Sequence, residues 1–142
     1  MPRLPFRVQF GVSGDYKLWA ADGWHHDAND REHTWANHLA KLRVMLEFTN
    51  TDLLLEVDVI PLTVRGVNQE LFVFMNGAFV AYWPVAQSGI KKARVESALL
   101  GARESVIALL MPNALCPRDV GVSTDERTLG LAFRSLSISA IE

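Results

Sequence analysis

All four histidines of the chain lie in one stretch that also carries three carboxylates. Residues 23–38 read GWHHDANDREHTWANH and contain His25, His26, His33 and His38 together with Asp27, Asp30 and Glu32. Imidazole nitrogens and carboxylate oxygens are the ligands that zinc and similar divalent cations take in proteins. The composition of this stretch therefore makes His25, His26 and His33 candidate metal ligands.

The spacing of these residues argues against a known metal or catalytic motif. The stretch contains no HExxH sequence, and residues 39–142 contain no histidine that could complete a coordination shell. In one strand, His33 and His38 would point to opposite faces, because successive side chains alternate. No serine or cysteine nucleophile stands in a recognisable catalytic context. We therefore predict no cofactor and no catalytic residue, and interpret the stretch as a polar loop at the rim of the fold, held at its ends by two buried tryptophans, Trp24 and Trp35.

Aromatic side chains offer a different chemistry, the stacking of flat rings on sugars. A tryptophan or tyrosine ring packs against the apolar C–H face of a pyranose, while nearby polar side chains hydrogen-bond its hydroxyl groups. The chain has four tryptophans and two tyrosines. Core packing remains the competing interpretation for Trp24 and Trp35, because the same residue types fill the interiors of β-proteins. The predicted ligand-binding aromatic residues are Trp24, Trp35, Trp83 and Tyr82.

Opposite charges are interleaved in residues 117–133, PRDVGVSTDERTLGLAF. An arginine that pairs with a carboxylate through two parallel hydrogen bonds is well suited to fasten such a loop. We expect Asp125 with Arg127, or Asp119 with Arg118, to form a clamp between this loop and the sheet. The alternative is a site for an anionic or hydroxyl-rich ligand, in which Asp125 and Arg127 would contact the ligand.

Length and charge narrow the range of functions. A chain of 142 residues with 49% hydrophobic content can bury one core but is short for two ordinary domains, so we predict one domain over residues 1–142. A net charge of −2 without a long basic run argues against nucleic-acid binding. A single cysteine and a start without a secretory signal pattern favour a cytoplasmic location. We expect no membrane span, because Glu56 and Asp58 interrupt the longest apolar stretch.

Alternation of apolar and polar side chains with a period of two predicts the strands of the first half. The alternation is clearest over residues 40–48 and recurs over residues 53–59. The dipeptide Asn76-Gly77 is the one best suited to a type I′ turn. It predicts a β-hairpin that joins residues 71–75 to residues 78–82.

The second half of the chain adds an exposed strand and two apolar ones. Residues 90–95, IKKARV, read as an edge strand whose lysines oppose pairing with another edge. We expect a short helical turn within residues 96–102 and central strands over residues 104–112 and 129–141. About eight short strands without a long amphipathic helix predict an all-β fold, an antiparallel β-sandwich of jelly-roll type with at most a short helical turn. A small closed barrel is the alternative.

Three segments of the sequence resemble a known group of domains. They are ADGWHHDANDREHTWA (residues 21–36), VFMNGAFVAYW (residues 73–83) and RVESALLGARESVIALLMPNALCPRDVGVSTDERTLGLAFRSLSI (residues 94–138). Their GW…E…TW start and D-x-R-x-LG end resemble the small β-sandwich accessory domain attached to bacterial glycosyltransferases and surface-polysaccharide assembly proteins. FMNGAFV is also similar to the Asn-Gly hairpin of galactose-binding-like jelly rolls. The resemblance runs from about Asp15 to Ile138 and includes Gly23, Trp24, Glu32, Thr34, Trp35, Asn76, Gly77, Asp125, Arg127, Leu129 and Gly130.

The resemblance implies a noncatalytic carbohydrate-binding or accessory module that acts in bacterial surface-polysaccharide synthesis. Such a module would contact an oligosaccharide or dock onto a glycosyltransferase or another polysaccharide-assembly protein. The chain departs from the group in having no attached transferase domain, which suggests action in trans, and in the HHDANDREH segment between its tryptophans. Two alternatives remain open. One is a structural or scaffolding protein that binds only protein partners, including copies of itself in a homo-oligomer, and the other is a small metal-dependent enzyme that uses the histidine cluster.

Overall fold

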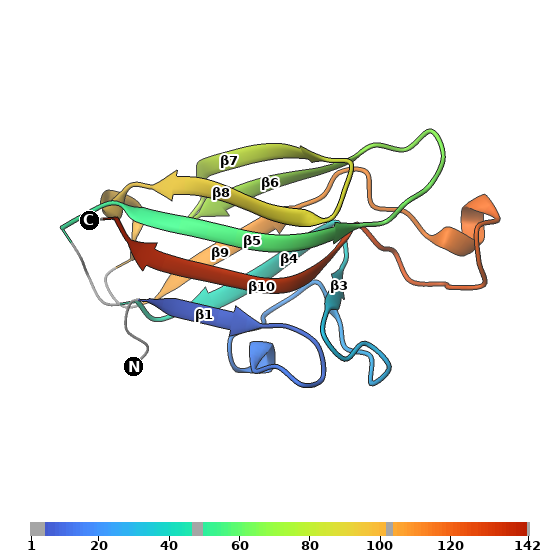
Figure 1. Ribbon diagram of the computed structural model, residues 1–142, viewed down its shortest axis with the longest axis horizontal. Coiled ribbons are helices and arrows are strands. Elements are labelled where there is room, and N and C mark those ends of the chain that lie inside the picture. Colours follow the sequence, from blue (N-terminus) through green and yellow to red (C-terminus); the bar gives the residue numbers. More distant parts are fainter. Residues whose placement is uncertain (1–4, 47–49, 102–103, 142) are drawn as a thin grey trace.

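Two antiparallel β-sheets packed face to face form the structure, a computed structural model that describes residues 5–46, 50–101 and 104–141 (Figure 1). Sheet A contains β1 (Phe6–Gln9), β2 (Trp24–His25), β3 (Thr34–Ala36), β5 (Leu53–Pro61), β8 (Gly89–Val95) and β10 (Leu131–Ala140). Sheet B contains β4 (Leu39–Val44), β6 (Gln69–Met75), β7 (Ala78–Val85) and β9 (Ser105–Leu110). The connections include the 3₁₀ turns η1 (Tyr16–Leu18), η2 (Ser97–Leu99) and η3 (Pro117–Val120). In the described residues, no helix has the length and apolar character needed to cross a membrane.

Strand β10 lies at the centre of sheet A. One edge of β10 pairs with β5 along its whole length, from Leu131 opposite Pro61 to Ala140 opposite Leu53. Two short strands share the other edge, because β3 pairs with the beginning of β10 and β1 pairs with residues 135–138. Strand β8 pairs with β5 and lies at the end of the sheet, which confirms the edge strand predicted from its lysines.

In sheet B the strands follow the order β4, β9, β6 and β7. The turn between β6 and β7 has positive φ angles at both Asn76 (51°) and Gly77 (84°), as a type I′ turn requires. Asn76 also ties the turn to the neighbouring segment, because its Oδ1 accepts a hydrogen bond from the Val106 backbone N–H at 2.8 Å and its Nδ2 donates to the Leu99 carbonyl oxygen at 2.7 Å. The predicted hairpin is therefore confirmed.

Alternating side chains fill the space between the two sheets. Along β5, residues Leu53, Leu55, Val57 and Val59 are completely buried, and the side chains between them lie on the outer face. At one end of the core the Phe10 ring contacts the Trp24 and Phe133 rings, with centroids 4.9 and 5.8 Å apart. Each fully buried side chain of this kind contributes about 1.5–3 kcal/mol relative to an exposed one. The interior provides the rigid frame to which the loops are attached.

The all-β sandwich predicted from the sequence is confirmed, and the closed-barrel alternative is wrong because the strands form two separate sheets. The predicted helical turn corresponds to η2, and both strands predicted to be central, β9 and β10, have partners on each side. Strands β1, β2 and β3 were not predicted from the sequence, because they have two to four residues each, too few to show a clear alternation. Residues 47–48, at the end of the first predicted strand, lie outside the described residues.

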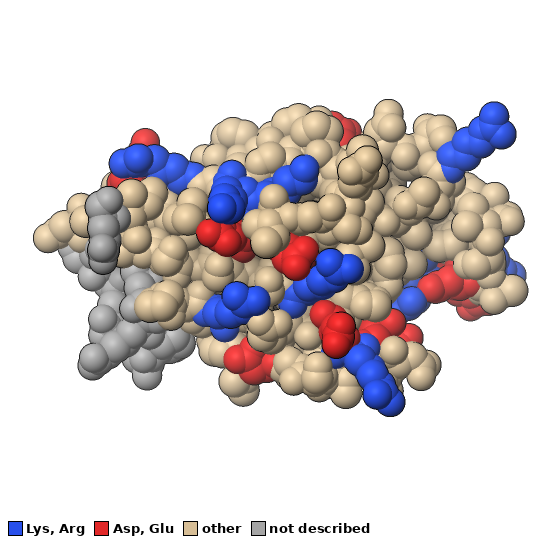
Figure 2. All heavy atoms as spheres, viewed as in Figure 1, with Lys and Arg blue, Asp and Glu red and all other residues tan. Residues whose placement is uncertain are grey.

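The outer faces of the two sheets differ in character. Lys, Arg, Asp and Glu side chains are spread over the face formed by β8, β5, β10 and β1 (Figure 2). The strand register of sheet A places Glu56 opposite Lys92. On sheet B, by contrast, Phe72 contacts Tyr82 at 4.7 Å between ring centroids, and Phe74 contacts Phe79 at 6.0 Å. The outer face of the β6–β7 hairpin is therefore aromatic.

Candidate functional site

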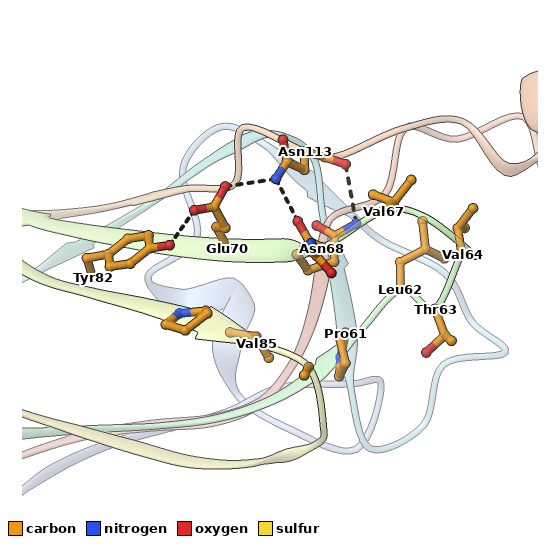
Figure 3. Close-up of a pocket in the computed structure, with 13 residues that line it drawn as sticks. Pro61, Leu62, Thr63, Val64, Val67, Asn68, Glu70, Tyr82, Val85 and Asn113 are labelled. Carbon is orange, nitrogen blue, oxygen red and sulfur yellow. Dashed lines mark hydrogen bonds between the residues drawn. The ribbon is translucent and has the colours of Figure 1, made fainter.

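A cavity of about 460 Å³ opens at the end of the sandwich, where β5 leaves sheet A and β6 enters sheet B (Figure 3). Its volume lies within the range of roughly 300–1,000 Å³ found for small-molecule sites. Apolar groups form part of its lining, and the polar groups come from the start of β6, the last part of β7 and the neighbouring loops. The apolar lining is Pro61, Leu62, Val64, Val67, Pro84, Val85 and Ala86, and the polar lining is Thr63, Asn68, Gln69, Glu70, Tyr82 and Asn113.

The loop of residues 62–68 forms one wall of the cavity. Its start is fixed to the opposite connection, because the Leu62 backbone N–H donates to the Gly130 carbonyl oxygen at 3.1 Å. The Val67 N–H then donates to the Val64 carbonyl oxygen at 3.0 Å, and Gly66 has a φ of 82°. A type II turn needs this positive φ at its third residue, which glycine adopts at little cost. The local sequence VRGV thus gives the wall a defined shape.

Glu70 is the centre of the polar network in the cavity. Its Oε2 accepts a hydrogen bond from the Tyr82 hydroxyl group, and its Oε1 accepts one from Asn113 Nδ2 at 2.9 Å (Figure 3). The same amide nitrogen donates to the Asn68 carbonyl oxygen at 2.6 Å. The hydrogen bond to Glu70 raises the pKa of Tyr82, so the phenol stays protonated over a wide range of pH. These bonds hold the side chains of two strands and one turn in a fixed arrangement.

Gln69 is a buried polar side chain in the lining of this cavity. It is only 2% exposed, and its Nε2 donates to the Asn113 carbonyl oxygen at 3.3 Å. Within the described part of the chain, no group donates to its Oε1. A buried acceptor that lacks a donor costs about 1–3 kcal/mol. Gln69 is thus a buried polar side chain of the cavity lining whose amide oxygen has no donor among the described residues.

The structure places the four predicted aromatic residues in different surroundings. Tyr82 is 41% exposed and lines the cavity. Trp83, its neighbour on β7, is half-buried and packs against the core. Trp35 is half-buried and meets the edge of the His33 ring, with 6.1 Å between centroids. Of the four, only Tyr82 lines this cavity.

Trp24 belongs to the hydrophobic core. It is 8% exposed, and its indole Nε1 donates to the Lys41 carbonyl oxygen at 2.9 Å. Phe10 and Phe133 contact its ring, so its faces are not open to a sugar. The competing interpretation, core packing, therefore describes Trp24, and we leave it out of the candidate site. The prediction that Trp35 is also a buried residue is wrong, because Trp35 is only half-buried.

Asp125 and Arg127 form the expected ion pair, but the clamp joins two loops. Arg127 Nη2 lies 2.8 Å from Asp125 Oδ2, and its Nε also donates to that carboxylate. Its Nη1 reaches Asp30 at 3.4 Å and Asp27 at 3.5 Å, in the connection between β2 and β3. The Arg127 guanidinium lowers the pKa of Asp125, and the pKa of Arg127 is raised in return. The alternative prediction, a pair between Asp119 and Arg118, is wrong, because Arg118 pairs with Glu126.

The histidines that were candidate metal ligands have separate partners. His25 Nε2 lies 2.7 Å from the Thr128 carbonyl oxygen, and His33 Nε2 lies 3.5 Å from Asp30. His26 Nδ1 lies 2.6 Å from the hydroxyl oxygen of the buried Tyr16, and partial burial lowers the pKa of His26. In residues 5–46, 50–101 and 104–141, no group of three or more His, Cys, Asp or Glu side chains is placed to hold a metal ion. The structure thus does not bring His25, His26 and His33 together.

Most of the residues that line the cavity were not predicted from the sequence. Glu70, Gln69 and Asn113 stand in segments without a motif, and 43 positions separate Asn113 from Glu70. Glu70 is on the outer face of β6 and looks like any solvated strand residue in the sequence. Only the aromatic run around Tyr82 pointed to the right strand.

Comparison with known proteins adds information on the fold. No protein-family model matches the sequence, and no curated protein matches it. Among solved structures, the chain is similar to the CBM36-1 domain of a xylanase from the hindgut metagenome of Trinervitermes trinervoides, with a TM-score of 0.54, 11% identity, and coverage of 96% of this chain and 98% of that domain. The carbohydrate-binding module CBM6cm-2 of Cellvibrio mixtus lichenase 5A, determined in complex with cellotriose, gives a TM-score of 0.51 at 10% identity, with 96% and 98% coverage. The chain shares the β-sandwich fold of these modules.

Larger enzymes contain a similar unit. A ruminal GH26 endo-β-1,4-mannanase matches with a TM-score of 0.56 at 8% identity, over 99% of this chain and 27% of the mannanase. The chain therefore spans about a quarter of that enzyme's length, whereas it spans almost all of the two binding modules. At this level of identity the likeness concerns the fold, and any function has to be argued from the site.

Proposed function

We propose that the protein is a noncatalytic carbohydrate-binding domain whose ligand occupies the cavity at the start of β6 and the end of β7. The observation that carries this proposal is the combination of an apolar wall with a fixed polar network around Glu70 and Tyr82. Sugars present C–H faces and hydroxyl groups together, and sites that bind them need both kinds of partner. The resemblance of the fold to carbohydrate-binding modules supports the same proposal.

Tyr82 is the residue best placed to contact a sugar ring. Its phenol is 41% exposed at the cavity, and the contact with Phe72 and the hydrogen bond to Glu70 restrict its movement. A ring that is already held in place loses little conformational entropy when a ligand stacks on it. Pro84 and Val67 provide further apolar surface in the same lining.

The test is calorimetric titration of the protein with neutral cello-, xylo- and manno-oligosaccharides of four to six sugars, with and without a chelator. We expect Tyr82→Ala to weaken binding of the best ligand by about tenfold, from the loss of about 1–2 kcal/mol of stacking and hydrogen bonding. The matched control is Phe79→Ala, because Phe79 is an exposed aromatic residue on the same strand that does not line the cavity.

Each outcome of this titration bears on the location of the site. Equal losses in the two variants would move the site to the aromatic face of the hairpin, and an effect of Phe79→Ala alone would exclude the cavity. Loss of binding with the chelator would favour the metal-dependent alternative. Absence of binding to every oligosaccharide would refute the proposed function.

We also propose a biological role, a partner and a location for the protein. They are a role in bacterial surface-polysaccharide synthesis, a glycosyltransferase or another assembly protein as partner, and a cytoplasmic location. The sequence resemblance supports the first two, and the single cysteine supports the third. Copurification with a tagged polysaccharide glycosyltransferase, compared with an unrelated transferase, tests the partner.

A protein-binding role is the second candidate function. Phe79 on β7 and Ile90 on β8 are 58% and 57% exposed, and these two strands are the outer strands of their sheets on the same side of the sandwich (Figure 1). Exposed apolar residues on edge strands favour association with another protein. Light scattering over a range of concentrations tests self-association, and Phe79→Ser should reduce it if these residues form the contact.

A further inference from the structure

We propose that the cavity at the start of β6 and the end of β7 selects glycans without acidic groups and discriminates against uronate- or sulfate-bearing chains. This inference rests on the proposed carbohydrate-binding function and names the class of ligand. Its basis is the charge and the hydrogen-bonding character of the cavity lining.

The charged side chain in the lining is a carboxylate. Glu70 lies in the cavity, and the thirteen lining residues include no Lys, Arg or His side chain to compensate it. Arg65 is in the same loop as one wall, but it is exposed and does not line the cavity. An acidic group of a ligand would therefore meet a like charge without a cationic partner, which is unfavourable.

Three side chains near Glu70 already donate hydrogen bonds within the protein. Asn113 Nδ2 donates one hydrogen to Glu70 and the other to the Asn68 carbonyl oxygen. The Tyr82 hydroxyl hydrogen is given to Glu70, and Gln69 Nε2 donates to Asn113. The Asn113 amide and the Tyr82 hydroxyl group thus have no hydrogen left for a ligand, whereas the Glu70 carboxylate can still accept.

The acceptors that remain are suited to hydroxyl and amino groups. Glu70 is only partly buried, and its carboxylate oxygens have lone pairs beyond those used by Tyr82 and Asn113. A sugar hydroxyl can donate to such oxygens, and an ammonium group can do so with opposite charge. A carboxylate or sulfate has only acceptors and would leave both sides unpaired.

The experiment compares neutral and acidic probes of equal length. Cello-, xylo- and mannotetraose are titrated beside tetrasaccharides of the same backbones that carry one uronate group. We expect the acidic probes to bind at least about tenfold more weakly, with a smaller difference at high salt because screening weakens the repulsion. Tetrasaccharides that bind the protein equally well in neutral and acidic form would overturn the inference and leave the proposed function intact. Absence of binding by both sets overturns both.

Variants identify the group responsible. Glu70→Gln keeps the hydrogen-bond geometry, because its Oε1 can accept from Asn113 while its amide donates to the Tyr82 hydroxyl oxygen. This variant should reduce the difference in affinity between neutral and acidic probes to about threefold or less. Arg65→Gln alters the net charge without changing the lining and should leave the discrimination unchanged. Thr63→Lys adds a cation at an exposed position of the lining and should strengthen binding of the acidic probes. Discrimination that stays at its original value in both Glu70→Gln and Thr63→Lys would overturn the assignment to this cavity.

Discussion

The Arg127 cluster allows a quantitative test of how two distant loops are held together. Arg127 is 28% exposed at its side chain and faces Asp125, Asp30 and Asp27 at 2.8, 3.4 and 3.5 Å. Replacing it with methionine keeps most of the side-chain volume but leaves three carboxylates close together. Two unit charges 4 Å apart interact by about 4 kcal/mol at an effective dielectric constant of 20, and the hydration of the partly exposed groups offsets part of this.

We therefore expect Arg127→Met to lower the free energy of unfolding by about 2–3 kcal/mol, equivalent to a fall in Tm of about 8 °C for a domain of this size. The matched control is Arg118→Met in the same connection, whose pair with Glu126 has side chains that are 61% and 72% exposed. An exposed pair contributes less than about 1 kcal/mol, so this variant should melt within about 3 °C of the wild type.

Salt and pH separate the electrostatic explanation from a loss of packing. The loss in Arg127→Met should shrink in 1 M salt, because screening reduces the repulsion among the carboxylates. The folded-state pKa of Asp125 lies below its ordinary value of 3.8, so its contribution to stability is present above about pH 4 and is lost as the pH falls through the folded value. This acid dependence should weaken in the variant. Urea titrations that give equal losses for Arg127→Met and Arg118→Met would refute the reasoning.

Three further predictions concern stability. In urea titrations, Asn76→Ala should lower the free energy of unfolding by about 2–3 kcal/mol, and Asn76→Gly should lower it clearly less. Both variants lose the side-chain hydrogen bonds, but only alanine is strained at positive φ. The opposite order would contradict the turn assignment. The pKa of His26 is lowered below 6.5 in the folded state, so the contribution of the neutral imidazole to stability is complete above that pH and declines as the pH falls. Between pH 7.5 and 5, Tm should therefore drop less in His26→Gln than in the wild type. Gly23→Ala should destabilise the protein by more than about 3 kcal/mol, because a Cβ there would lie 1.9 Å from the Leu39 carbonyl oxygen. Gly66 has open space around it, so Gly66→Ala should lower the free energy of unfolding by only about 1 kcal/mol. Similar melting temperatures for the two variants would show that the close approach at Gly23 is relieved.

The layered architecture could be predicted from local patterns. Alternation along residues 40–46 and 53–59 places one set of side chains inside, and all of the apolar members of that set in β4 and β5 are buried. The Asn76-Gly77 turn was predicted for a physical reason, since few other dipeptides accept two positive φ angles. Short strands such as β2 and β3 could not be predicted, because two or three residues show no period.

The sequence by itself determined which face of each long strand is buried, since side-chain alternation is a local property of an extended chain. It did not determine which loops meet. Only the tertiary structure brought Asn113 to Glu70 across 43 positions and Arg127 to Asp30 across 97 positions. Closure of the two sheets decides these contacts, because the path of each loop depends on where its strands are placed in the sandwich and not on the residues of the loop alone. The same closure buried Trp24 and left Tyr82 open at the cavity, although the two aromatic residues look alike as sugar-binding candidates in the sequence.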